Sequence, residues 1–332
     1  MLNKYDYVII GAGLSGSVAA RELTNSGARC LVMDKRDHIG GNCYSYYVGG
    51  IEVHKYGPHI FHTNKKHLWD YANKYSEWVP YYHEVKSLHN GVLYDFPPNI
   101  NTINELCGTL KVTQKIKKAL YKAFYEGYSI KAWFGKKPPL DILKRLPIKD
   151  TNDNNFFSDK YQALPLMGYD EFFVSLLKGI DVWLGVEFDS NNFKHSKLIY
   201  SGRPDSLYHY EYGKLKFRGE YFKTFIFSQN SINGMPVINY ADGSDHDLRQ
   251  MEYKFFVNGK PQDNGYTIVQ NEGAEKEGDI YPYKDKRSID LYQRYFDKAN
   301  SDGVTLIGRM GTYKYMDMDQ TIESTLEIVG KL

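Results

Sequence analysis

The chain has 332 residues, enough for two or three lobes and a sizeable core. Its 42 lysine and arginine residues nearly balance its 40 acidic residues, and the formal net charge of +2 gives no support to nucleic-acid binding or membrane-surface binding. No apolar run approaches the length of a membrane span and no signal-peptide pattern precedes the first strand-like run, so we expect a cytoplasmic protein without a membrane partner.

Residues 5–42 are predicted to form a dinucleotide-binding unit. An apolar run at residues 7–10 indicates a strand, which leads through Gly11, Gly13 and Gly16 into a helix and then into a second strand that ends at Asp34. The first glycine permits a tight turn, the second lets a pyrophosphate approach the backbone, and the third lets the helix pack closely on the sheet. Asp34 would accept hydrogen bonds from a ribose hydroxyl. The alternative is a glycine-rich turn in an ordinary doubly wound sheet.

The loop after Asp34 is expected to complete the phosphate site. Arg36 offers a cation, and the glycine pair at residues 40–41 offers exposed N–H groups. The residues of this unit that we expect to bind the dinucleotide are Gly11, Gly13, Leu14, Ser15, Gly16, Asp34, Lys35, Arg36, Gly41 and Asn42.

Residues 51–64 contain two histidines, His59 and His62, around an apolar pair. The Gly-Pro step at residues 57–58 indicates a stiff, irregular turn instead of a continuous strand or helix. Two histidines without a third ligand nearby are more often structural than metal-binding, so we predict no metal site. The three cysteines also lack a disulfide or metal-ligand spacing.

Helix and hairpin signals alternate through the middle of the chain. Residues 65–78 have helical spacing, and residues 81–94 alternate before the break at 96–102, which predicts a hairpin of a second lobe. Helical spacing returns at residues 103–133, with lysines that read as a solvated face. Residues 138–177 are then expected to form a loop that contains several prolines, followed by another helix.

The last third of the chain favours strands. We expect a strand at residues 197–200, followed by alternating segments that suit an antiparallel sheet, namely 212–217, 221–228, 235–240 and 251–257. Residues 304–330 read as a strand, a glycine turn and a closing helix. Such a unit commonly returns to the first sheet, which would make the first domain discontinuous.

Five motifs in order carry a family resemblance. They are GPHIFHTN at residues 57–64, YSIKAW at 128–133, ILKRLP at 142–147, YGKLKFR at 212–218 and GRMGTYKYMDMDQTI at 308–322. With them the chain resembles the UDP-galactopyranose mutases of the bacterial type, from Tyr5 to about Leu326. The resemblance implies an α/β fold with three parts and a cleft between them. These are a Rossmann-like FAD-binding domain with a parallel sheet (1–76, 178–208 and 300–332), a small helical domain (101–177) and an antiparallel sheet domain (77–100 and 209–299).

The implied activity is that of an isomerase in galactofuranose biosynthesis. The family interconverts UDP-galactopyranose and UDP-galactofuranose with reduced FAD, whose N5 acts as nucleophile at the anomeric carbon. An unidentified reductant would keep the flavin reduced. We also weighed a mutase for another nucleotide sugar such as UDP-N-acetylgalactosamine, an FAD-dependent amine oxidase or hydroxylase, and a module that binds without turnover.

The resemblance also implies roles for individual residues. Arg145 and Arg218 match the family's diphosphate-clamping arginines, although without the resemblance they would be taken for surface arginines in ion pairs. Tyr281 and Tyr315 match residues that contact the diphosphate. Tyr128 and Trp133 match residues at the uridine and sugar, with Phe124 one turn earlier on the same helix. Arg309 matches an arginine beside the flavin and sugar, and the matches against the flavin are His59, Ile60, His62, Asp317 and Met318. The implied catalytic set is Arg145, Arg218, Arg309 and His62.

Some positions depart from the family pattern. Phe156 and Phe157 stand where a Tyr-Phe pair is common in the family. His83 stands where asparagine is frequent near the sugar. We expect all three residues to bind substrate, and these departures leave the sugar preference open. The stretch 104–128 is shorter than usual, which predicts a shortened helical domain. Because that domain supplies the dimer contact in bacterial relatives, we predict a monomer, with a dimer as the alternative.

Overall fold

The first sheet is built around the predicted dinucleotide unit. The computed structural model describes residues 4–135, 147–189, 197–242 and 247–332. Five parallel strands lie in the order β10-β2-β1-β11-β17. They are β1 (Tyr7–Ile10), β2 (Cys30–Asp34), β10 (Asp181–Leu184), β11 (Lys197–Tyr200) and β17 (Val304–Leu306). All but β10 were predicted, and the return of β17 to this sheet confirms the expectation for the C-terminal unit.

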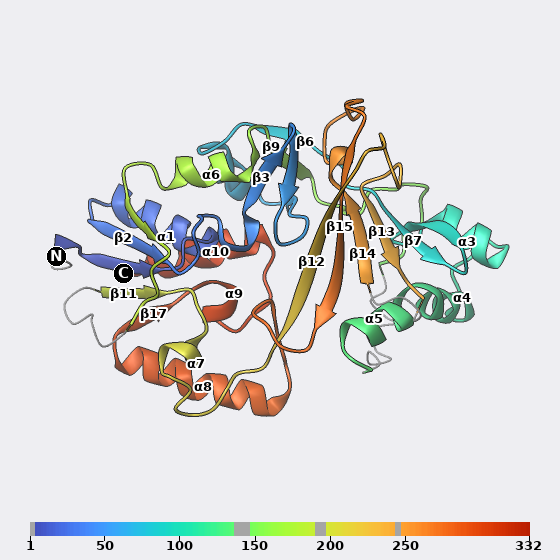
Figure 1. Cartoon of the computed structure of the whole chain (residues 1–332). Helices are drawn as coiled ribbons and strands as arrows, with labels where there is room; N and C mark the ends of the chain where they lie inside the picture. Colours follow the sequence, from blue (N-terminus) through green and yellow to red (C-terminus); the bar gives the residue numbers. More distant parts are fainter. Residues whose placement is uncertain (1–3, 136–146, 190–196, 243–246) are drawn as a thin grey trace.

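Helices from both ends of the chain pack beside this sheet. The helix α1 (Leu14–Asn25) packs against β1, β2 and the closing helix α10 (Met318–Val329), and Figure 1 shows the two helices together. The helix α8 (Lys286–Ser301) packs on β17 and on α7 (Pro204–Leu207) at the bottom of Figure 1. The sequence interpretation did not include α8, although its N-cap Asp285 accepts a hydrogen bond from the Ser288 amide. None of the described helices is long and apolar enough to cross a bilayer.

The second sheet has seven strands and is not wholly antiparallel. Its order is β16-β12-β15-β14-β13-β7-β8. The strands are β7 (Val85–His89), β8 (Val92–Phe96), β12 (Phe217–Phe227), β13 (Val237–Tyr240), β14 (Asp247–Glu252), β15 (Thr267–Glu275) and β16 (Tyr281–Pro282). The pair β7 and β13 is parallel, which corrects the antiparallel expectation. Parallel neighbours need a long connection, and the chain between β8 and β13 supplies one.

Two predicted strands of this sheet are wrong. Residues 212–216 are not in a strand, and after Glu252 the chain turns through a short 3-10 helix, Tyr253–Phe255, that buries Tyr253. The strand β15 was not predicted because Gln270 and Glu272 are buried in it, and polar residues at buried positions hide the alternation. The predicted hairpin is confirmed as β7 and β8.

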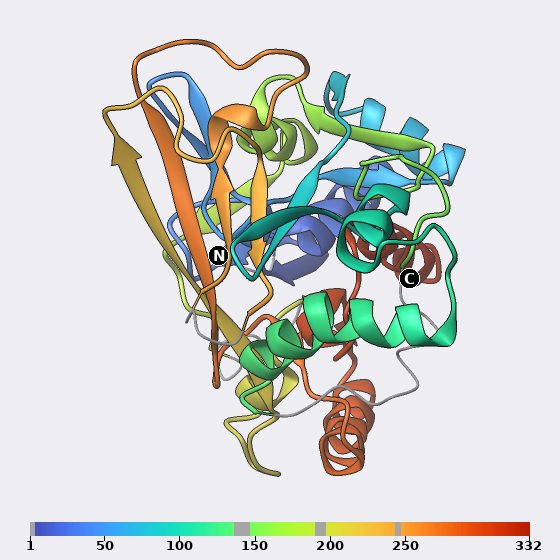
Figure 2. The same cartoon turned by 90° about the vertical axis from the view of Figure 1, so that its right-hand side faces the viewer.

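The helical segment is a rod with one irregular turn. It contains α3 (Ile100–Cys107), then α4 (Gln114–Leu120), a π-helical segment (Tyr121–Glu126) and α5 (Gly127–Ala132), and Figure 2 shows the last three as one continuous rod. Asn99 and Thr113 cap α3 and α4 by accepting backbone N–H groups. The predicted helix over residues 103–133 is thus confirmed except for a break at residues 108–113.

Small sheets connect these parts. A hairpin joins β3 (Ser45–Val48) to β4 (Ile51–His54), and a three-stranded sheet contains β5 (Phe61–Thr63), β9 (Tyr161–Pro165) and β6 (Trp78–Pro80). The helix α2 (Lys66–Asn73) is shorter than predicted because Trp78 pairs with β9. The helix α6 (Gly168–Leu176) buries Phe172 and Phe173 in the core cluster between the sheets. The division into three domains with the residue boundaries given above stays a prediction.

Candidate active site

One cavity of about 710 Å³ joins the glycine turn of the first sheet to strands of the second sheet and to the helical rod. This volume is in the range of small-molecule and cofactor sites. Most of the predicted site residues line it, namely Gly11, Gly13, Leu14, Ser15, Asp34, Lys35, Arg36, Gly41, Asn42, His59, Ile60, His62, His83, Phe124, Tyr128, Phe156, Phe157, Tyr281, Arg309, Tyr315, Asp317 and Met318.

Three predicted residues do not line the cavity, and a fourth lies outside the described residues. A Cβ at Gly16 would lie 1.8 Å from the Gly11 carbonyl oxygen, so Gly16 permits close packing of α1 on β1. Trp133 packs its ring edge against Tyr283, and Arg218 is buried behind the ring of Tyr281. Arg145 lies in the stretch 136–146, which the structure does not describe.

The end of the cavity at the glycine turn fits a dinucleotide pyrophosphate. No side chain caps the N-terminus of α1 at Gly13, and no acidic residue lies in its first turn, so the N–H groups of this turn remain available to an anion in the cavity. A Cβ at Gly13 would fill the space 3.5 Å from Gly41. The Asp34 carboxylate accepts hydrogen bonds from the Ala12 and Arg36 amides at 2.7 and 2.9 Å, which fixes it beside this turn.

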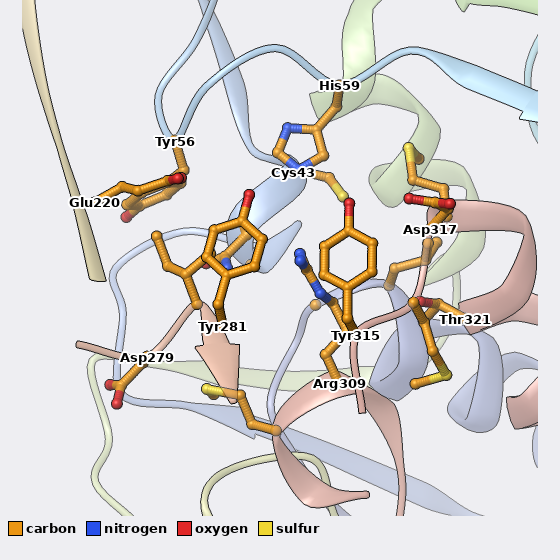
Figure 3. Close-up of a pocket in the computed structure, with 18 of the residues that line it drawn as sticks. Cys43, Tyr56, His59, Glu220, Asp279, Tyr281, Arg309, Tyr315, Asp317 and Thr321 are labelled. Atoms are coloured by element: carbon orange, nitrogen blue, oxygen red, sulfur yellow. The ribbon is translucent and has the colours of Figure 1, made fainter. Parts of the chain in front are cut away.

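Tyr281, Tyr315 and Arg309 form a cluster at the middle of the cavity. The two tyrosine rings stack with centroids 5.5 Å apart, and the Arg309 guanidinium lies 4.5 Å from the Tyr315 ring (Figure 3). Burial raises the pKa of both phenols, that of Tyr315 to about 12, so both remain hydrogen-bond donors at neutral pH. Among the described residues the buried Nε of Arg309 has no partner, and such a donor suits an anionic ligand.

The predicted histidine pair is held by hydrogen bonds to other groups. His62 Nδ1 lies 2.9 Å from Asp159, and its ring stacks on Phe157 with centroids 3.8 Å apart. His59 Nδ1 donates to the Gly57 carbonyl at 2.9 Å, and burial lowers the pKa of His59 to about 3. Within the described ranges, no group of three or more His, Cys, Asp or Glu side chains could hold a metal ion.

Arg218 is enclosed on all sides. Its guanidinium lies between the rings of Trp133 and Tyr281, at 5.0 and 4.2 Å. It donates to Glu220 at 2.8 Å and to the Ala132 carbonyl at 3.3 Å, and only 4% of the residue is exposed. In this conformation Arg218 positions Tyr281 and Glu220, and its direct role on a diphosphate stays a prediction.

Sequence reasoning missed several residues that line the cavity. Arg249 on β14 lines it and pairs with the buried Glu272 at 2.6 Å, and Glu220 on β12 lines it beside Arg218. A usable signal was present for Arg249, because it shares a strand face with the buried Met251 and an arginine on a core face needs a partner or a ligand. Glu220 gave no local signal, since apart from Arg218 the groups around it come from β14, β15, β16 and α5.

Comparison with known proteins identifies relatives along nearly the whole chain. A family model for UDP-galactopyranose mutase matches residues 123–315, and one for NAD(P)-binding Rossmann-like domains matches residues 9–75. A probable UDP-galactopyranose mutase of Klebsiella pneumoniae is 34% identical over 98% of this chain and 94% of its own length. A dTDP-fucopyranose mutase of Escherichia coli is 32% identical, covering 96% of each chain.

Solved structures show the same fold. A crystal structure of reduced UDP-galactopyranose mutase superposes with a TM-score of 0.73 and 14% identity, covering 99% of this chain and 96% of that one. A putative protoporphyrinogen oxidase from Exiguobacterium has a TM-score of 0.68 and 11% identity, covering 98% of each chain. The fold is therefore that of a Rossmann-like flavoprotein, and it occurs in proteins with different names.

Proposed function

Because the chain belongs to the UDP-galactopyranose mutase family, we propose that it interconverts UDP-galactopyranose and UDP-galactofuranose with reduced FAD. The observation that carries this proposal is the continuity of the cavity. A site for a dinucleotide pyrophosphate and a cluster of phenols and a cation line the same space. A cofactor and a nucleotide sugar can therefore meet inside it.

FAD would lie with its pyrophosphate on the N-terminus of α1 and Gly41, and with a ribose at Asp34. When bound and reduced, it would supply N5 as the nucleophile at the anomeric carbon. Asp317 and His62 line the same cavity, and both have fixed positions. Asp317 is the N-cap of α10 in a capping box with Gln320, while Asp159 and Phe157 hold the His62 ring.

The departing diphosphate would be held by Tyr281, Tyr315 and Arg309. Two neutral phenols donate hydrogen bonds, and the unpartnered Nε of Arg309 is a charge-assisted donor already in place. Such fixed donors stabilise negative charge that develops as the bond to the anomeric carbon breaks. Arg249 adds a second cation to the lining.

The nucleoside and sugar would lie along the aromatic side of the cavity. Tyr128 and Phe124 reach it from the rod, where the π-helical turn widens the helix. Phe156, Phe157 and His83 form the adjoining wall, with the His83 ring 6.1 Å from that of Phe157. Aromatic faces suit a base and the apolar face of a sugar.

A mutase for a different nucleotide sugar is the second candidate. The wall of Phe156, Phe157 and His83 offers few hydroxyl groups to a sugar, and the E. coli dTDP-fucopyranose mutase is nearly as similar to this chain as the Klebsiella mutase. An amine oxidase is disfavoured because it would leave Arg309, whose Nε has no partner among the described residues, without an anionic ligand.

Product analysis distinguishes these candidates. The reduced protein is given UDP-galactopyranose, UDP-N-acetylgalactosamine and dTDP-fucopyranose in parallel, and furanose formation is measured by chromatography. We expect the highest kcat/KM for UDP-galactopyranose. A higher kcat/KM for either of the others would replace the proposed substrate, and oxygen-consuming turnover of an amine would reject the mutase reaction.

A further inference from the structure

Glu220 is a buried carboxylate on the wall of the cavity. Its side chain is 5% exposed and lines the cavity, and Figure 3 shows it on the side of the cavity away from Asp317. Arg218 donates to its Oε1 at 2.8 Å. Within the described residues no protein group bonds to Oε2 of Glu220, so this oxygen is left to the cavity.

Among the described residues, Glu220 belongs to a cluster of four charged side chains whose formal charges sum to zero. The acids are Glu220 on β12 and Glu272 on β15, and the cations are Arg218 on β12 and Arg249 on β14. Each arginine already has a carboxylate at 2.6 to 2.8 Å. The cluster therefore offers no net positive charge to an anionic ligand, although the clustered tyrosines and Arg309 nearby suit one.

A nucleotide diphosphate diester carries two negative charges. In a cavity of low dielectric constant these charges repel an ionised Glu220, because screening by water is weak there. Adding one proton to Glu220 would remove this repulsion, give the cluster a charge of +1 and turn the free oxygen into a hydrogen-bond donor.

We propose that Glu220 binds the nucleotide sugar as a neutral carboxylic acid, taking up one proton when the diphosphate enters the cavity. This inference rests on one part of the proposed function, namely that the ligand is a nucleoside diphosphate sugar. Glu220 is thus a binding residue for that ligand, and no step of the isomerisation is assigned to it.

The groups around Glu220 agree with this protonation. Burial and the neighbouring Glu272 raise the pKa of Glu220 to about 7, against the opposing effect of Arg249 and Arg218. Within the part of the chain that the structure describes, the other titratable groups that face it are Tyr281 on β16 and Tyr128 on α5, and burial keeps both phenols neutral. A bound diphosphate adds negative charge and raises the pKa of Glu220 further.

The sign of the pH dependence follows from this shift. Above the pKa of the ligand-free protein the proton must be taken from solvent, so the Kd of the ligand rises about tenfold per pH unit until the pKa of the complex is reached. Below neutral pH Glu220 already holds its proton, and the Kd is constant.

Proton uptake can be measured directly by titration calorimetry in buffers of different ionisation enthalpy. The probe is UDP-galactopyranose, whose diphosphate diester has no group that titrates near neutral pH. The flavin is left oxidised during the titration. We expect uptake of about one proton per ligand near pH 8. Glu220→Gln retains an acceptor for Arg218 and imitates the neutral acid, so it should bind near pH 8 with higher affinity than the parent, and without proton uptake.

Asp279→Asn is the matched control. Asp279 also lines the cavity and pairs with an arginine, Arg203, but is 41% exposed, so its variant should take up a proton as the parent does. Binding by the parent without proton uptake, or undiminished uptake by Glu220→Gln, would overturn this inference alone. Failure of UDP-galactopyranose to bind at every pH would overturn the proposed function and this inference with it.

Discussion

Arg218 shows how a residue can shape a site without lining it, because it packs on Tyr281 and pairs with Glu220, which both line the cavity. The side chains of Arg218 and Glu220 are both almost fully buried, and Arg218 donates to Glu220 at 2.8 Å. We expect Arg218→Ala to destabilise the protein by about 3 to 5 kcal/mol, because it leaves the Glu220 carboxylate buried without its cation. Adding Glu220→Gln should restore part of that loss. Urea unfolding of the two variants tests this, and a double variant no more stable than the single one would contradict it.

His54 and His83 give the protein a defined sensitivity to acid. They are 1% and 4% exposed, and burial lowers the pKa of each to about 3. His54 lies 3.7 Å from Glu52, beyond hydrogen-bond range, and we therefore treat it as neutral. Both rings are neutral in the folded state, whereas unfolded histidines take up protons below about pH 6.5.

The contribution of these buried histidines to stability should therefore be constant above that pH and fall as the pH drops below it, by about 1.4 kcal/mol per pH unit for each histidine. His83→Asn removes one of the two histidines, so it should reduce the slope of stability against pH by about 1.4 kcal/mol per pH unit. His67 is exposed, so His67→Asn should leave this slope unchanged. The free energy of unfolding measured between about pH 7 and pH 5 is the readout. Equal slopes for the parent and His83→Asn would show that His83 is not buried in its neutral form.

At the scale of single residues, the sequence was informative where the chemistry is local. The glycines and Asp34 lie within one short unit, so their spacing alone predicts a dinucleotide site. Arg249 and Glu220 depend on neighbours from distant strands. The strand pattern marks Arg249 only as an arginine on a core face, and no local pattern marks Glu220. The placement of Arg218 behind Tyr281 also required the sheet, because β12 and β16 meet only through the tertiary fold.

The turn between β1 and α1 assigns different roles to two glycines. Gly13 has an ordinary extended backbone, and an added Cβ would meet Gly41 at 3.5 Å, which is van der Waals contact. We expect Gly13→Ala to fold but to lose flavin, because its methyl group occupies the space for the pyrophosphate. Gly16→Ala places its Cβ 1.8 Å from the Gly11 oxygen and should destabilise the fold itself.

Flavin absorbance per protein and the thermal midpoint separate these two effects. Gly27→Asn is the control for flavin content: an added Cβ there meets nothing within 4 Å, although its φ of +91° strains any side chain and should lower the midpoint alone. Full flavin content in Gly13→Ala, or a parental midpoint in Gly16→Ala, would reject the corresponding role.

At the scale of elements, periodic segments were predicted well and segments with buried polar groups were not. The rod, the hairpin β7–β8 and the closing helix α10 have clear periods. In contrast, β15 carries the buried Gln270 and Glu272, whose partners lie on other segments. The rule that alternation marks a strand fails there because cross-strand hydrogen bonds replace apolar burial.

At the scale of the whole molecule, the cavity exists only because segments from all parts of the chain converge. The first sheet supplies the cofactor end, the second sheet supplies Tyr281, Arg249 and Glu220, and the rod supplies Tyr128. Each part alone would lack a complete site, which is consistent with relatives that match almost the full chain.

The oligomeric state also belongs to this scale. We predict a monomer because the sequence indicates a helical segment shorter than in bacterial relatives, with a dimer as the alternative. Light scattering of the flavin-loaded protein at micromolar concentration tests this prediction. A stable dimer would show that the remaining rod, or another face, is enough for association.

The most direct test of the central claim is turnover by the reduced protein. Protein reduced with dithionite under anaerobic conditions is mixed with UDP-galactofuranose, and the appearance of UDP-galactopyranose is followed by chromatography, with oxidised protein in parallel. We expect pyranose to accumulate only with reduced flavin, at a rate proportional to protein. No pyranose from fully reduced, flavin-loaded protein at saturating substrate would contradict the assignment of this cavity as a mutase site.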